Sequence, residues 1–266
     1  MEDDIIQVKS AVKIFDELAA VDNITFDVKR GEIFAFLGPN GAGKTTTIKM
    51  LTTLLAPTSG EILIDGNNVE DDKNAVRKAF GIVFQDPSLD DELTAYENMY
   101  FHGVLYKVPK AIRNARIEQL LKLVELWGRK DDLVKEFSGG MKRRLEIARG
   151  LIHLPKILFL DEPTLGLDPQ TRNYIWSYIQ DLNKKENITV FLTTHYMEEA
   201  EKVAERIAII DHGKIITVGT AAELKKQTNT ATLEEAFLAL TGKKIRDHEG
   251  SPVEAMRMHH QMWRRR

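Results

Sequence analysis

The glycine-rich segment Gly38–Thr46, reading GPNGAGKTT, carries the residue types and spacing needed to bind phosphate. It fits the pattern GxxxxGK[ST], in which glycines let successive backbone N–H groups turn toward a phosphate without a Cβ in the way. The apolar run Ile33–Leu37 precedes it, and Thr46–Leu51 can continue as a helix whose positive N-terminal end favours an anion. The segment therefore predicts a nucleoside triphosphate site.

Two side chains of this loop have predicted roles in the chemistry. We expect Lys44 to reach the β- and γ-phosphates and the Thr45 hydroxyl to ligate Mg²⁺. The other loop residues expected to contact the nucleotide are Gly38, Asn40, Gly41, Ala42, Gly43 and Thr46. A chance glycine-rich turn is the alternative, and the strand–loop–helix context argues against it.

A second candidate for chemistry is the pair of carboxylates that ends the apolar run Ile157–Leu160. Ligands of parallel sheets bind at the carboxyl ends of the strands, so both acids are expected near the phosphate loop. We expect Asp161 to hold Mg²⁺ through water and Glu162 to polarise the attacking water as a general base. A solvated acidic turn before Pro163 is the alternative.

A third candidate is FSGGMKRR at Phe137–Arg144, where Ser138, Gly139 and Gly140 precede a helical pattern. These residues would form another nest of N–H groups with a hydroxyl. One nucleotide needs only one such cradle within a single fold, so the second suggests a phosphate supplied by another subunit. An ordinary serine N-cap is the alternative.

The pattern of apolar runs predicts an α/β fold. Strands are expected at Ile5–Val8, Ile24–Val28, Ile33–Leu37, Glu61–Gly66, Ala79–Gln85, Ile157–Leu160, Thr189–Thr193 and Ile207–Ile210. Helical patterns fall at Thr94–Trp127, Leu145–Leu154, Gln170–Leu182, Met197–Val203 and Leu233–Leu240. Strands that alternate with helices indicate a mostly parallel, doubly wound sheet.

Composition narrows the class of protein further. The 266 residues carry a net charge of −3, which gives no basic field for a nucleic acid, and they include no Cys. The acidic N-terminus is unlike a signal peptide, and no apolar run approaches the ~20 residues that span a bilayer. Any role at a membrane is therefore expected to come through a partner.

Four motifs in order, GPNGAGKTT, FSGGM, ILFLDEPTLGLD and FLTTH, give the chain its resemblance to a known family. It resembles the ATP-binding subunits of ABC transporters, and most of all those serving drug and antibiotic exporters of the daunorubicin-resistance type. The resemblance implies an ABC ATPase domain at 1–221 with an N-terminal antiparallel β-subdomain and a helical insertion at about 88–145. Residues 222–266 would form a small extension with a basic tail.

The resemblance also implies roles that the residues alone do not. Gln85 matches the glutamine that senses Mg²⁺ and signals to the membrane subunit, and Asp168 matches the aspartate that couples two sites across a dimer. His195 matches the histidine that contacts the γ-phosphate, and Phe15 stands where an aromatic stacks on adenine. Each residue also has a structural alternative when it is considered alone. Gln85 could be the polar end of a strand, and Asp168 could form an Asp-Pro turn. His195 could be a structural histidine, and Phe15 could be a core phenylalanine.

The partners expected from the resemblance are a second copy of the chain and a separate transmembrane permease. Two ATP–Mg²⁺ would lie in a head-to-tail homodimer, docked by the permease on the inner, cytoplasmic face of the cell membrane. In the signature motif FSGGM, Phe137 and Met141 stand where the family usually has Leu and Gln. The preceding segment DDLVKE lacks the acidic motif of fused-chain exporters, and this favours a separate permease. Segment Gln85–Tyr106 is expected to contact the permease, with Asn98 on its exposed face.

Two other classes of protein remain as alternatives. A soluble ABC ATPase of translation or DNA repair would usually carry two such domains or long coiled coils, and this chain shows neither. A purely regulatory nucleotide-binding module is disfavoured by the complete set of expected catalytic residues, Lys44, Glu162 and His195.

Overall fold

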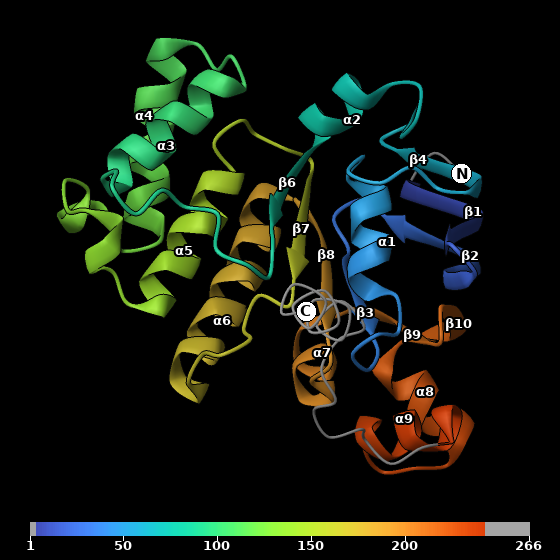
Figure 1. The fold of residues 1–266 in the computed structure, drawn as a ribbon. Helices are drawn as coiled ribbons and strands as arrows, with labels where there is room; N and C mark the ends of the chain where they lie inside the picture. The colour runs from blue at the N-terminus through green and yellow to red at the C-terminus, as the bar shows by residue number, and fades with distance from the viewer. Residues whose placement is uncertain (1–3, 243–266) are drawn as a thin grey trace, which may run out of the picture.

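Two β-sheets organise the chain in the computed structural model, which describes residues 4–242 (Figure 1). The antiparallel sheet has the strand order β2-β1-β4-β5. Its strands are β1 (Asp4–Phe15), β2 (Leu18–Lys29), β4 (Ser59–Ile64) and β5 (Asn67–Asn68). The antiparallel β-subdomain expected at the N-terminus is therefore present.

The second sheet is mostly parallel and has the order β10-β9-β3-β8-β7-β6. Its strands are β3 (Ile33–Leu37), β6 (Phe80–Val83), β7 (Ile157–Asp161), β8 (Thr189–Thr194), β9 (Arg206–Asp211) and β10 (Lys214–Gly219). Only β10 runs antiparallel to its neighbour. Because β3, β7 and β8 are adjacent and parallel, the segments that follow them meet at one edge of the sheet, which is the edge expected to bind the ligand.

Both faces of the parallel sheet are covered. The helices are α1 (Lys44–Leu51), α2 (Lys73–Ala79), α3 (Ala95–Leu105), α4 (Lys110–Leu123), α5 (Gly139–Gly150), α6 (Pro169–Glu186), α7 (Met197–Val203), α8 (Ala221–Thr228) and α9 (Leu233–Thr241), with short 3-10 turns at Trp127–Arg129 and Val134–Glu136. Figure 1 shows α3, α4 and α5 on one side of the molecule and the antiparallel sheet on the other.

Alternate residues of the central strands enter two separate cores. In β3, Phe34 and Phe36 pack into a core with α1, α2 and the antiparallel sheet, while Ala35 and Leu37 pack into the core with α3 to α9. Six phenylalanines gather in the first core, with neighbouring ring centroids 5.4–6.0 Å apart. Burial on both faces explains why these strands read as unbroken apolar runs.

Five of the helices described in residues 4–242 begin at a side-chain cap. Thr94 forms a reciprocal capping box with Glu97 at the start of α3, and Ser138 caps α5 by accepting the N–H of Met141. Asp168 caps α6, with Pro169 in the first turn. The serine N-cap given as the alternative interpretation of Ser138 is therefore present, and the phosphate role of Ser138–Gly140 stays a prediction.

Some sequence expectations need correction. The helical pattern at Thr94–Trp127 is two helices, because Pro109 separates α3 from α4. The helical pattern expected after Ser138–Gly140 is α5, which ends at Gly150, and α2, β10 and α8 were not expected. The basic tail lies outside the described residues.

Candidate functional site

The phosphate loop connects β3 to α1, as its sequence predicts. Gly43 has a φ of +104°, and a Cβ on it would lie 2.5 Å from the carbonyl oxygen of Ala20. A Cβ on Gly38 would lie 2.4 Å from the carbonyl oxygen of Ile210. Larger residues are therefore excluded at both fixed glycine positions of the motif. Between them, Asn40 and Gly41 are exposed and Ala42 is buried.

The first turn of α1 presents backbone donors to this loop. Within residues 4–242, none of the backbone hydrogen bonds to a carbonyl uses the N–H of Lys44, Thr45 or Thr46. The next N–H, that of Thr47, is already bonded to the carbonyl of Gly43 at 2.9 Å. Free N–H groups at a helix N-terminus suit an anion such as phosphate.

Lys44 connects this loop to the end of β7. Its Nζ donates to the carbonyls of Gly38 and Pro39 at 2.9 and 3.1 Å and lies 3.0 Å from Oε1 of Glu162. The other carboxylate oxygen of Glu162 lies 3.2 Å from Nδ1 of His195. The three residues predicted to be catalytic are therefore in contact, and Glu162 stands between the other two.

These contacts set the charge of Glu162. Burial would raise the pKa of its carboxyl, but the hydrogen bond from His195 and the positive charge of Lys44 outweigh burial and lower that pKa to about 2. Glu162 is thus ionised and tightly paired. Its φ of +47° is uncommon for a residue with a side chain and costs on the order of 1–3 kcal/mol, which the surrounding contacts must offset.

Asp161, the last residue of β7, has different surroundings. Burial raises the pKa of its carboxyl, against hydrogen bonds from Thr193 and Thr45 that lower it. The Thr193 hydroxyl donates to Asp161 Oδ1 at 2.6 Å and accepts the backbone N–H of Glu162 at 3.0 Å. Thr45 and Asp161, both predicted to serve the metal, are therefore adjacent and offer the hard oxygen ligands that Mg²⁺ prefers.

The second cradle is separate from this cluster. Ser138 and Gly140 line a hollow of about 240 Å³ together with Glu125 and residues of α5 and α6. A Cβ on Gly140 would lie 2.7 Å from the side chain of Thr171, which is hydrogen-bonded to Asp168. Gly139 begins α5 beside them. In the described part of the chain, Ser138–Gly140 shares no hydrogen bond or ion pair with Lys44, so one chain does not bring its two cradles together.

Two further predicted residues lie at the surface. Gln85 is exposed just after β6. Phe15 ends β1 and is 44% exposed, with Nζ of Lys13 5.3 Å from its ring centroid. The alternative of a core phenylalanine at position 15 is therefore wrong, and its ring is free to stack.

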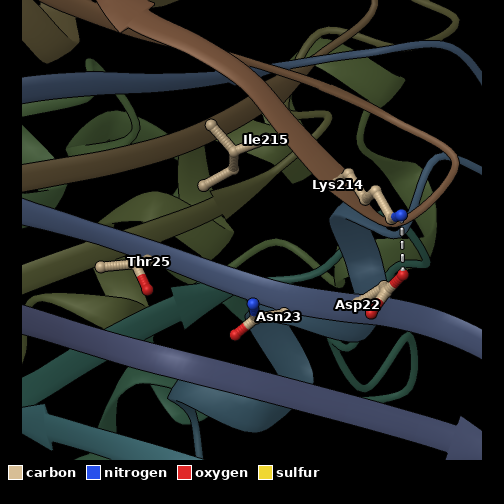
Figure 2. Close-up of a pocket in the computed structure, with 5 residues that line it drawn as sticks. All are labelled: Asp22, Asn23, Thr25, Lys214 and Ile215. Atoms are coloured by element: carbon tan, nitrogen blue, oxygen red, sulfur yellow. Dashed lines mark ion pairs between the residues drawn. The ribbon is translucent and has the colours of Figure 1, made fainter.

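Another hollow, of about 380 Å³, is lined by Asp22, Asn23, Thr25, Lys214 and Ile215 (Figure 2). An ion pair of 3.1 Å joins Lys214 to Asp22 beside it. None of the predicted site residues lines this hollow, and it lacks the convergent glycines and N–H groups of the phosphate loop.

Two residues that hold Glu162 and its neighbours in place were not identified from the sequence. Thr193 lies within the quoted FLTTH and Arg143 within FSGGMKRR, but neither was given a role. Arg143 donates to the carbonyl oxygens of Glu162 and Pro163. The basic side chains at 142–144, which follow Ser138–Gly140, would usually be interpreted as a solvent-exposed face of the helix. Only the burial of Arg143 in the structure shows that it contacts other elements.

Known proteins resemble the chain in sequence and in structure. The ABC transporter family matches residues 21–165. The chain is 41% identical to a daunorubicin/doxorubicin resistance ATP-binding protein of Streptomyces peucetius, over 86% of this chain and 69% of that protein. It is 39% identical to a linearmycin resistance ATP-binding protein of Bacillus subtilis, over 88% and 77% of the two chains.

Solved structures agree. The structure of an ATP-binding subunit of an ABC transporter matches with a TM-score of 0.81 at 30% identity, covering 89% of this chain and 99% of that one. A dimeric bacterial ABC transporter cassette matches with a TM-score of 0.72 at 30% identity, covering 81% and 98%. The chain belongs to the ABC transporter family. Within it, the chain is an ATP-binding subunit that hydrolyses ATP, as the four sequence motifs predicted.

Proposed function

We propose that the chain powers a separate membrane permease that exports a drug-like or lipidic compound. The observation that carries the catalytic part is the contact of Glu162 with both Lys44 and His195 at the strand edge beside the phosphate loop. The drug-resistance names of its relatives support the direction and the class of compound. No helix among residues 4–242 is long and apolar enough to cross a bilayer. We place the chain on the inner, cytoplasmic face of the membrane.

The proposed assembly is a head-to-tail homodimer in the ATP-bound state. Each ATP would lie between the phosphate loop of one subunit and the Ser138–Gly140 cradle of the other. The separation of these two cradles in one chain and the dimeric state of a related cassette support this arrangement. Asp168, beside the second cradle, would couple the two nucleotide sites across the dimer. Phe15 would stack on the adenine.

In the proposed hydrolysis, Glu162 accepts the proton of the attacking water. Lys44 and His195 stabilise negative charge on the γ-phosphate. The oxygens of Thr45, Asp161 and Gln85 would hold Mg²⁺, which neutralises charge on the phosphates. For Glu162 to act as a base, its pKa must rise from about 2, and this follows when Lys44 exchanges the carboxylate for phosphate.

An exposed apolar patch on α3 and α4 supports docking to a permease. Phe101, Val104 and Leu105 lie on one face of α3, and Ile112 lies in the first turn of α4. All four are between 44% and 77% exposed, which is unusual for grouped large apolar side chains. The patch falls at the end of the segment Gln85–Tyr106 that was predicted to contact the permease.

One detail of that prediction is wrong. Asn98 is not on the exposed face but is 5% exposed. Its amide accepts from the N–H of Asp90 and donates to the carbonyls of Asp90 and Thr94. A lysine there would break the loop before α3 and would not test docking.

The proposal is tested by capturing the tagged chain from solubilised native membranes and identifying the bound proteins by mass spectrometry. A polytopic membrane protein in stoichiometric amount is the expected partner. Ribosomes or DNA in its place would favour the soluble ATPases of translation or repair and would contradict the transport role.

A further inference from the structure

Arg143, on α5, reaches into two loops at once. Its Nε donates to the carbonyl oxygen of Pro163 at 2.7 Å and its Nη2 to that of Glu162 at 3.2 Å. Its Nη1 donates to the carbonyl oxygen of Phe84, the residue before Gln85, at 2.6 Å. The side chain is almost fully buried. One guanidinium therefore joins the signature helix to the loop of the proposed base and to the loop of Gln85.

Glu146, one turn further along α5, completes this connection. Its Oε2 lies 3.0 Å from Nη1 of Arg143, and its Oε1 accepts the backbone N–H of Ser88 at 2.7 Å. Arg149, the next residue on the same face, donates to the carbonyl oxygen of Ser88 at 2.6 Å. The three charged side chains thus hold both ends of segment 84–88 against the helix that begins at Ser138.

The backbone of Glu162 is held from both sides. Its left-handed conformation is sparsely populated and persists only when neighbouring groups enforce it. The Thr193 hydroxyl accepts its N–H, and Arg143 donates to its C=O. A buried ion pair adds little stability by itself, because desolvation opposes the attraction of the charges. The bonds of Arg143 to the carbonyls of Glu162 and Phe84 fix the positions of these backbone atoms.

We propose that Arg143 is a positioning residue that fixes the Glu162 backbone, and with it the carboxylate, relative to the signature helix. The inference rests on the proposed role of Glu162 as the base. Because Ser138 is the N-cap of α5, a movement of this helix on binding phosphate at Ser138–Gly140 would shift the carbonyls of Phe84 and Glu162 together. Lysine cannot substitute, because a point charge lacks the planar fork that reaches three carbonyls.

The first test is Arg143→Lys, which keeps the charge and removes the fork. We expect kcat for ATP hydrolysis to fall by about 10–100-fold with KM changed less than about twofold, since small misplacements of a catalytic group cost rates of this order. Arg116→Lys is the matched control. Arg116 is equally buried on α4 and pairs with Glu186 at 3.8 Å, away from the cluster. Arg116→Lys should keep the parent kcat. An unchanged kcat in folded Arg143→Lys would overturn the inference.

The second test separates positioning from a general loss of structure. Once Glu162→Gln has removed the base, Arg143→Lys should lower the residual hydrolysis by less than about twofold, because residues acting through one group are not additive. The same fold-loss in both backgrounds would contradict the inference. If Arg143→Lys does not fold, Glu146→Gln is measured in the same way, with a smaller loss expected. Parent-rate hydrolysis by Glu162→Gln would instead contradict the proposed base.

Discussion

Nζ of Lys44 lies 3.0 Å from Oε1 of Glu162, and both side chains are buried. The residue proposed to bind phosphate and the residue proposed to activate water are therefore paired with each other. In the proposed mechanism, phosphate oxygens would compete for the same ammonium, so binding of ATP would release the carboxylate. This exchange makes the chemistry of the two residues interdependent, and several measurements depend on it.

Glu162→Gln keeps the size and hydrogen-bonding reach of the side chain but removes the base. We expect ATP to bind and hydrolysis to fall by about 10²–10⁴-fold, the usual contribution of a positioned acid–base group. Unhydrolysed ATP should then hold two subunits together, which size-exclusion chromatography with light scattering detects. Glu198→Gln, at an exposed position on α7, is the matched control and should behave as the parent. If Glu162→Gln hydrolyses ATP at the parent rate, Glu162 is not the base, and Asp161 or His195 becomes the candidate.

Lys44→Ala should have the opposite effect on the dimer. Without the ammonium the loop loses its charged contact to the phosphates, so nucleotide affinity and the ATP-dependent dimer should both be lost. Titration with a fluorescent ATP analogue measures the affinity. Lys49→Ala, an exposed position on the same helix, should bind as the parent does. A Lys44→Ala protein that still dimerises with ATP would show that Lys44 is not essential for holding the nucleotide.

Sequence alone predicted much of this site, because local chemistry fixes it. The glycines of the loop, the two acids after an apolar strand and the parallel sheet could be read from spacing and burial patterns. Other features depend on contacts distant in the chain. Nothing near Glu162 indicates the approach of Arg143, and a 3.6-residue pattern does not show that Asn98 faces a loop and not solvent. The lengths of β1 and β2 were also underestimated, because the exposed ends of these strands have no apolar pattern.

The depressed pKa of Glu162 predicts a pH dependence of stability. Its folded-state pKa of about 2 lies below the ordinary value of 4.5, so its ionised form adds stability above pH 4.5 that is lost as the pH falls toward 2. Urea unfolding of the parent and of Glu162→Gln should therefore show a difference in unfolding free energy that shrinks between pH 4.5 and 2. Burial and, in smaller part, the charge of Glu162 raise the pKa of Asp161, so the difference reports both carboxylates. A difference independent of pH would contradict the Lys44–Glu162–His195 pairing.

Leu105→Lys tests the apolar patch as the contact with the permease. Leu105 is 77% exposed at the end of α3, so a charge there costs the folded chain little but would be buried without a partner in an apolar interface. We expect basal ATPase activity and thermal stability to be unchanged, while the amount of permease recovered with the tagged chain falls by at least about tenfold, the result of losing roughly 1.4 kcal/mol or more of binding free energy. Ile216→Lys provides the matched control, since Ile216 is a large apolar residue on β10 that is 42% exposed, at the opposite edge of the parallel sheet from β6. Equal recovery of the permease with Leu105→Lys and with the parent would place the contact elsewhere, and a loss with Ile216→Lys alone would place it on the β10 edge.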